Sequence, residues 1–184
     1  MSDASRPIAD SSTNVKLTSR PRRDDDLPFI EALHAEFDAE RLLLDDADVD
    51  ESMKQGLLHI QSKGRDAGHQ NAEWDKKECV IEFNGDLVGS MVLYQDTEEI
   101  RLADLIISQT HRGLGVGIAM MTSIQQEAAA SNRVLRLHVD KTNTDAIRFY
   151  EQRGFRLLED RGRHLFVEWT PPDMTGKRLY FPGQ

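Results

Sequence analysis

The sequence predicts a single α+β domain built on a mixed, mostly antiparallel sheet. The dipeptide Asn84-Gly85 between two alternating apolar segments predicts a β-hairpin. Residues 99–108 predict a third antiparallel strand beside it. A glycine-rich turn, a helix-period segment and another alternating segment then follow, and this order predicts a crossover to a parallel strand. The chain therefore combines antiparallel strands with one parallel connection.

The N-terminal part predicts one short strand followed by two helices. Residues 15–19 form the expected strand, and the three acids Asp24-Asp25-Asp26 suit the start of a helix. Its expected buried stripe consists of Leu27, Ile30, Leu33 and Phe37. A second helix is expected over residues 49–60. An acidic run over residues 45–51 joins the two, and its carboxylates either bind a cationic group or simply cap helices and are solvated.

The hairpin strands are expected at residues 78–83 and 87–94, after a loop over residues 64–75. Cys79, Ile81 and Phe83 alternate onto one face of the first strand. Gly89 within the second strand is expected to mark a bulge or a close backbone approach.

The central stretch begins with a short apolar strand at residues 105–107 that leads into a glycine-rich turn, Arg112–Gly117. Apolar residues at steps of four then predict a helix, namely Val116, Met120, Ile124 and Ala128. A strand over residues 135–139, a second helix ending at Gly154, and paired strands at 155–158 and 164–169 complete the domain.

A glycine turn before a helix suits an anion, because free N–H groups and the helix dipole both point toward it. A Walker loop needs Lys followed by Ser or Thr, whereas this chain has Ile118-Ala119. The spacing of the dinucleotide fingerprint also fails. The turn alone therefore predicts either a pyrophosphate cradle of another kind or a tight turn without a ligand.

Composition bounds the classes of function. The chain has 184 residues, enough for one domain with a proper core, and a formal charge of −9. That charge argues against nucleic acid as a partner and is compatible with a cationic acceptor. A single cysteine, Cys79, fits a reducing cytoplasm. Residues 1–14 are polar and predict a disordered leader, and no segment has the length of a membrane span.

The central stretch resembles the Gcn5-related N-acetyltransferase (GNAT) family. The turn matches that family's Arg/Gln-x-x-Gly-x-Gly/Ala signature with Arg112, Gly115 and Gly117. A later signature follows at the family's spacing, with Asn143, Ala146, Phe149-Tyr150 and Gly154-Phe155. The resemblance covers roughly residues 77–169. It implies a domain over residues 15–170, a tail over 171–184, six to seven strands, about four helices, and two central parallel strands that splay apart.

The resemblance also implies acetyl-CoA as co-substrate and assigns residues to it. Backbone N–H groups of the turn would hold the pyrophosphate, and an N–H near Ile106-Ile107 would face the thioester oxygen. Arg112 has the charge for a phosphate contact, and Asn143 would contact the cofactor arm or cap a helix. The implied cofactor-binding residues are Ile106, Ile107, Arg112, Gly113, Leu114, Gly115, Val116, Gly117, Asn143 and Tyr150.

Two residues are the implied catalytic pair. Tyr150 matches the family tyrosine that protonates the leaving thiolate, or else it is a core tyrosine. Asp104 is the candidate base, or holds a cationic acceptor, or lies on the solvent side of its strand; Glu99 is a second candidate. Cys79 lacks an evident partner base for a nucleophile. No cluster of side chains has metal-ligand spacing, so no metal is expected.

The function that follows is acetyl transfer from acetyl-CoA to a primary amine by direct attack in a ternary complex. The acceptor classes left open are small cationic or polyamine-like amines, antibiotics and protein amines. The alternative is an acyl-CoA-binding sensor or interaction domain on the same fold without catalysis. The sequence leaves a homodimer open and predicts neither a nucleic-acid nor a membrane partner.

Overall fold

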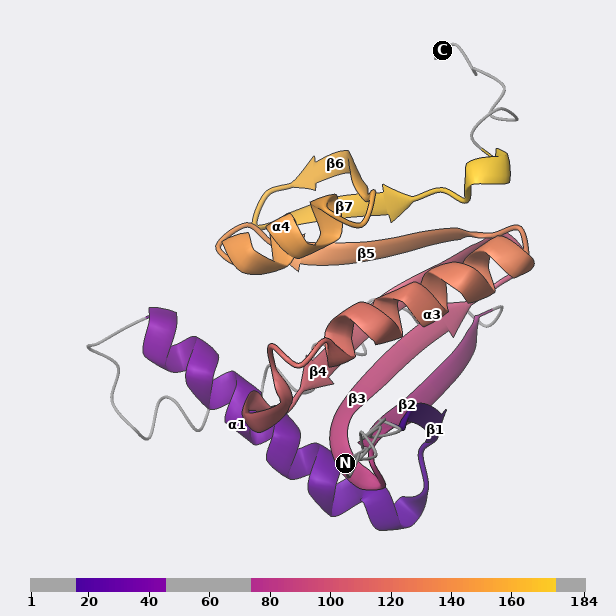
Figure 1. The fold of residues 1–184 in the computed structure, drawn as a ribbon. Coiled ribbons are helices and arrows are strands. Elements are labelled where there is room, and N and C mark those ends of the chain that lie inside the picture. The colour runs from indigo at the N-terminus through magenta and orange to yellow at the C-terminus, as the bar shows by residue number, and fades with distance from the viewer. Residues whose placement is uncertain (1–15, 46–73, 175–184) are drawn as a thin grey trace, which may run out of the picture.

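The computed structural model describes residues 16–45 and 74–174. They form one sheet of seven strands in the order β1-β2-β3-β4-β5-β7-β6 (Figure 1). The strands are β1 (Leu17–Pro21), β2 (Asp75–Phe83), β3 (Asp86–Gln95), β4 (Glu99–Ile107), β5 (Val134–Asp140), β6 (Arg156–Arg161) and β7 (His164–Trp169). Only β4 and β5 pair in parallel. The predicted mixed, mostly antiparallel sheet is confirmed.

The described residues contain three α-helices, α1 (Leu27–Asp45), α3 (Val116–Ala130) and α4 (Thr144–Glu151). Short 3-10 turns precede α1, precede α3 and follow β7; they are η1 (Asp24–Asp26), η2 (Gln109–His111) and η3 (Pro172–Met174). The expected helix over residues 49–60 lies outside the described residues. So do the expected leader, residues 46–51 of the acidic run, and the tail from residue 175.

Two strands begin more than one residue away from the expected start. β1 begins at Leu17, two residues later than expected, and β2 begins at Asp75, so the last residue of the expected loop belongs to a strand. Residues 75–78 pair with the far end of β3, where Asp75 lies opposite Gln95. The first three of these residues are polar and exposed, and this part of the strand therefore carries no alternating apolar signal.

Helix α3 covers one face of the sheet and forms the main core with it. The four residues predicted for its inner stripe, Val116, Met120, Ile124 and Ala128, are all buried. They belong to one cluster with β-sheet residues that include Leu93, Leu102 and Leu137. Helix α1 packs against the opposite face of β3 and β4. The sheet therefore separates an apolar layer under α3 from a second layer under α1.

The start of α1 is fixed by a buried carboxylate. Asp26 accepts two hydrogen bonds from the Arg20 guanidinium, at 2.7 and 2.9 Å, and one from the Arg23 backbone N–H at 2.7 Å. The Arg20 hydrogen bonds are the main reason that the pKa of Asp26 falls to about 2. Beyond it, Leu33 is buried as expected, whereas Leu27 is 41% exposed because it opens onto a cavity on this side of the sheet.

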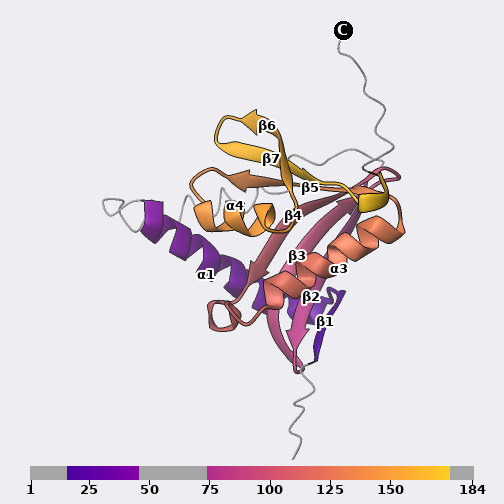
Figure 2. The ribbon, with the colours of Figure 1, turned by 45° about the horizontal axis from the view of Figure 1, so that its top comes forward.

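The parallel pair separates after four residue pairs. β4 and β5 are paired only from Glu99 opposite Val134 to Leu102 opposite Leu137. Beyond that point β4 continues beside β3 alone, and β5 continues beside β7 alone. Figures 1 and 2 show the two strands diverging toward the end where α3 begins and α4 lies. The predicted splay of the central strands is therefore present.

A bulge lies at the point where the strands separate. Val92 pairs with Asp104 and Leu93 with Leu102, so Ala103 has no partner on β3. One extra residue reverses the alternation of sides along a strand. Leu102 faces the core under α3, and Asp104 lies on the α1 side, where it meets a side chain of that helix.

Gly89 combines the two features that the sequence predicted for it. The β2–β3 register shifts beside it, and a Cβ atom at this position would lie 2.5 Å from the Ile106 carbonyl oxygen and 2.9 Å from Ile107 Cδ1. No side-chain rotation relieves a contact with a backbone atom. The approach of β3 to the end of β4 therefore requires glycine.

We expect Gly89→Ala to lower the free energy of unfolding by about 1–3 kcal/mol, because it forces β3 and β4 apart. Gly117→Ala is the control, since its Cβ would meet only Phe149, at 3.9 Å, within a helix where alanine is favoured. Urea unfolding of both variants measures the difference. Equal stability of the two variants would show that the β3–β4 contact relaxes without cost.

Candidate active site

The glycine-rich turn joins β4 to α3 through backbone conformations that favour glycine. Gly113 and Gly115 have φ angles of 74° and 83°, and nothing lies within 4 Å of a Cβ atom built on either. Gly117 lies inside the helix and needs no such freedom. The turn therefore requires glycine at two of its three positions, and it leaves open space above both of them.

The start of α3 presents backbone donors without a side-chain cap. Gly115 is the N-cap residue, and the first N–H of the helix that bonds to a helical carbonyl is that of Ala119, at 3.0 Å from the Gly115 oxygen. No acidic residue lies in the first turn. The donors of residues 116–118 and the positive end of the helix dipole thus form a site suited to a phosphate group.

The Arg112 side chain has other partners than the expected phosphate. Its Nε donates to the Ile107 carbonyl oxygen at 3.0 Å, and its Nη1 lies 2.8 Å from Glu40 Oε2 on α1. The guanidinium therefore closes the end of β4 and links the turn to α1. In this arrangement the turn offers its backbone, rather than this charge, to an anion.

The separated part of β4 has an open backbone edge. The Ser108 N–H bonds to Val88 at 2.8 Å, and the Ile106 carbonyl also faces β3, where it lies close to Gly89. Because backbone groups alternate along an antiparallel strand, those of Leu105 and Ile107 face the other way, toward the space that β5 leaves. Of the predicted pair Ile106-Ile107, the alternation favours Ile107 as the donor.

Tyr150 lies on α4 beside this open edge, half-buried among aromatic rings. Its ring meets those of Phe149 and Phe155 edge-on, with centroids 5.3 and 5.4 Å away. Burial, and secondly the negative charge of Asp104, raise the pKa of Tyr150 to about 12. The phenol therefore keeps its proton at neutral pH. The electrostatic effect also shows that the two predicted catalytic residues are brought together.

Asn143 precedes α4 and caps it. Its side-chain oxygen accepts a hydrogen bond from the Ala146 N–H at 3.0 Å, and the residue is exposed. The helix-cap reading of this residue is confirmed. Its predicted contact with a cofactor arm stays a prediction.

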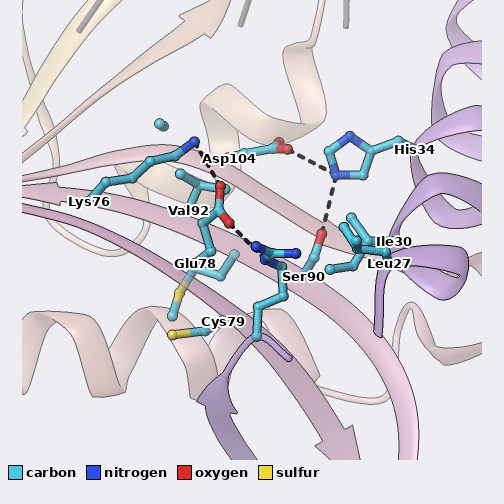
Figure 3. Close-up of a pocket in the computed structure, with 12 residues that line it drawn as sticks. Leu27, Ile30, His34, Lys76, Glu78, Cys79, Ser90, Val92 and Asp104 are labelled. Atoms are coloured by element: carbon cyan, nitrogen blue, oxygen red, sulfur yellow. Dashed lines mark hydrogen bonds and ion pairs between the residues drawn. The ribbon is translucent and has the colours of Figure 1, made fainter. Parts of the chain in front are cut away.

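His34 on α1 is a site residue that the sequence reasoning missed. Its Nε2 lies 3.5 Å from Asp104 Oδ2 and 3.4 Å from Ser90 Oγ (Figure 3). One nitrogen meets both partners, whereas a hydrolase triad uses the two ring nitrogens separately. The group is therefore a carboxylate positioned by a histidine. The available signal was the position of His34 one turn after Ile30 on the inner side of α1.

A cavity of about 300 Å³ lies between α1 and the sheet, and Asp104 and His34 line it. Leu27 and Ile30 contribute apolar surface from the helix, as Figure 3 shows. The cavity thus reaches Asp104 on β4, next to the point where β4 leaves β5. A small molecule in the cavity would have access to that carboxylate.

The other candidate groups have structural surroundings. Glu99 is buried at the end of β4 that pairs with β5, where it forms ion pairs with Arg101 and Arg136. It does not line the cavity. The Cys79 thiol points away from His34 in Figure 3, and burial raises its pKa, which disfavours the reactive thiolate.

Residues 16–45 and 74–174 contain no group of three or more His, Cys, Asp or Glu side chains arranged to hold a metal ion. Within the same ranges, no helix has both the length and the apolar character needed to cross a membrane.

Comparison with known proteins agrees with this geometry. The family model described as the acetyltransferase (GNAT) family matches residues 33–155. The 5-NmdU N-acetyltransferase of Pseudomonas phage PaMx11 is 31% identical over 99 residues, which cover 49% of this chain and 67% of that protein.

Solved structures show the same fold at lower identity. The PaiA N-acetyltransferase of Thermoplasma acidophilum, in complex with coenzyme A, superposes with a TM-score of 0.64 at 15% identity, over 84% of this chain and 99% of that one. The ribosomal-protein-S18-alanine N-acetyltransferase of Escherichia coli gives 0.57 at 19% identity, over 90% and 100%.

Proposed function

Because the chain belongs to the acetyltransferase (GNAT) family, we propose that it transfers an acetyl group to a small primary amine that enters from the α1 side of the sheet. The chain is an N-acetyltransferase, and acetyl-CoA is the co-substrate of its family. The observation that carries the finer proposal is the place of Asp104. It lines the α1-side cavity, lies on the part of β4 that no longer pairs with β5, and acts electrostatically on Tyr150.

The residues present fit acetyl-CoA on two observations. Gly113 and Gly115 leave open space over the uncapped start of α3, which suits a pyrophosphate. The open edge of β4 offers main-chain groups to an extended amide-containing arm. When bound, acetyl-CoA supplies the acetyl group as a thioester. The Ile107 N–H is the candidate to polarise the thioester oxygen.

Proton transfer in this proposal is divided between two side chains. An amine is nucleophilic only when neutral, and Asp104 accepts its proton directly or through a water molecule. His34 holds the Asp104 carboxylate from the α1 side at 3.5 Å. Tyr150 keeps its proton at neutral pH and donates it to the leaving thiolate. Direct attack then needs no covalent enzyme intermediate, in agreement with the raised pKa of Cys79.

The acceptor is proposed as a small molecule because the cavity is small and lies under α1. The phage relative is named for 5-NmdU, and we therefore include 5-NmdU among the acceptors to be tested. Thiol release with this compound, with aliphatic amines and with an N-terminal peptide distinguishes the acceptor classes. Release with the peptide alone would contradict a small-molecule acceptor.

For cofactor binding, we expect Gly115→Glu to abolish acetyl-CoA binding, because it forces an unfavourable φ and adds a negative charge at the cradle. Gly117→Ala is the control and should bind normally. Calorimetric titration with acetyl-CoA measures both. Normal binding by the Gly115 variant would remove the pyrophosphate assignment.

For the acid, we expect Tyr150→Phe to lower kcat on the order of 10²-fold and to leave the Kd for acetyl-CoA nearly unchanged. Because the pKa of Tyr150 is raised to about 12, tyrosine ionisation should not reduce the wild-type rate between pH 7 and 10. Tyr94→Phe, which removes a buried phenol from the other end of β3, is the control. Parallel loss of rate and binding would assign Tyr150 a packing role.

For the base, we expect Asp104→Asn to lower kcat/KM for the amine on the order of 10²-fold without weakening acetyl-CoA binding. Asp86→Asn, at the exposed start of β3, controls for loss of an acid elsewhere. Steady-state kinetics, measured by the release of the free thiol, distinguish the Asp104 variant from the Asp86 variant. An unchanged rate for the Asp104 variant would leave water as the base.

A further inference from the structure

The described residues include five large apolar side chains that are exposed to solvent. Leu27 lines the cavity under α1, and Leu114 and Ile118 lie in the glycine turn and the first turn of α3. These three therefore border the ligand sites of the proposed function. The other two, Leu157 and Leu158, are 58% and 43% exposed, follow each other on β6, and border neither the glycine turn nor the cavity under α1. Exposed apolar neighbours of this kind indicate a contact surface.

Strand β6 is the outermost strand of the sheet. It pairs with β7, and no strand in the described part of the chain pairs with its other side (Figures 1 and 2). Four of its six residues are charged, namely Arg156, Glu159, Asp160 and Arg161. Charged side chains on an edge strand oppose the addition of an arbitrary strand. A partner must therefore match the order of these charges as well as the two leucines.

A bulge brings the two leucines together. Leu157 pairs with Val167 and Glu159 pairs with Phe166, so Leu158 is the extra residue and lies with Leu157 opposite Val167. Leu157 and Val167 both line a cavity on the α4 side of the sheet. Because the extra residue reverses the alternation of sides, Glu159 lies on the other face, beside Phe166. The bulge therefore separates an apolar pair from an acid on the opposite face.

Two copies of β6 fit each other in an antiparallel register. When Leu157 lies opposite Leu158 of a second copy, Leu158 lies opposite Leu157 in return, and each Arg156 lies opposite a Glu159. Arg156 precedes Leu157 and lies opposite Glu168, so it shares the face of Glu159. Residues opposite each other in an antiparallel pair interact on one face, so the leucines meet on the α4 side and two ion pairs form on the other. A shift of two residues would instead place Arg156 opposite another arginine, Arg161.

The existing contacts of the two charged residues are compatible with this pairing. Arg156 is exposed, and residues 16–45 and 74–174 provide no ion-pair partner for it. Glu159 binds the Arg161 Nε through one oxygen, Oε2, at 2.7 Å. A carboxylate has a second oxygen that accepts hydrogen bonds, so Glu159 can meet the Arg156 side chain of a second copy while it keeps Arg161.

We propose that two copies of this chain associate through β6, edge to edge and antiparallel, with Leu157, Leu158, Arg156 and Glu159 as the residues that recognise the second copy. A contact of six residues a side is small beside that of a permanent dimer, so the association is reversible and depends on protein concentration. An unrelated extended segment lacks this order of charges and is disfavoured for that reason. The proposal concerns assembly and holds for any amine acceptor.

Sedimentation equilibrium of the full chain, between about 5 and about 500 μM, measures the association. We expect Arg156→Glu and Glu159→Arg each to raise the dimer Kd about tenfold, because like charges replace both exposed ion pairs. Arg148→Glu on α4 is the control, since it makes the same change of charge as Arg156→Glu at a side chain that is 73% exposed. An equal mixture of the two β6 variants should associate again, because the acids of one strand then face the arginines of the other.

The apolar part of the contact has a variant of its own. Leu158→Ser should raise the dimer Kd about tenfold, because it removes a leucine from each side of the contact. The side chain is exposed in the single chain, so the free energy of unfolding of the monomer should stay nearly unchanged. Urea unfolding at low protein concentration checks this for every variant.

A wild-type chain that stays monomeric at the highest concentration would overturn the proposal and assign the leucine pair to another occupant. A dimer that tolerates the β6 variants as well as it tolerates the Arg148 variant would also overturn it, because the contact would then lie on another surface. If the mixed variants fail to associate, the antiparallel register is wrong.

Discussion

The structure depends on the point at which β4 leaves β5. Four residue pairs hold the two parallel strands together, and the pairing ends at Leu102 opposite Leu137. The next residue, Ala103, is the unpaired residue of the bulge against β3. Without that extra residue Asp104 would face the apolar core under α3, where a carboxylate is costly to bury. With it, the carboxylate lies on the α1 side and the strand keeps an open edge.

The two faces of the sheet consequently differ in their surroundings. The α3 face is packed with apolar side chains, and this packing holds the glycine turn and the α4 aromatic residues in place. The α1 face carries charged and hydrogen-bonding residues around a cavity. Asp104 lines this cavity, and its charge also contributes to the raised pKa of Tyr150 on α4. The Asp104 carboxylate and the Tyr150 phenol thus interact electrostatically although they lie on different elements.

Local patterns allowed the sequence to predict most of the fold. The stripe of α3, the Asn84-Gly85 hairpin and the crossover strand each follow from spacing within a short segment. The family signatures on the turn and on α4 likewise lie within single segments, and they identified the family correctly. Tyr150, nominated from the second signature, and Asp104, nominated from its place on the strand before the turn, lie close enough to interact.

The parts that could not be predicted depend on contacts between segments. His34 reaches Asp104 only because α1 crosses β3 and β4 at that level, and no residue near His34 encodes the crossing. Ala103 is an ordinary strand residue in the sequence, so the bulge has no local mark. The charge of Arg112 suggested a phosphate partner, but Glu40, which pairs with it, lies on another element.

The ion pair between Arg112 and Glu40 joins two parts of the candidate site that are far apart in the sequence. It connects the glycine turn to α1, and the two side chains are 42% and 25% exposed. An exposed pair of this kind contributes little to stability and is weakened by salt. The far part of α1 is therefore tied to the turn by a contact that breaks at low cost, while Asp26 anchors the near end firmly. Raising the ionic strength therefore weakens this link between the turn and α1 and leaves the packing of α1 on β3 and β4 in place.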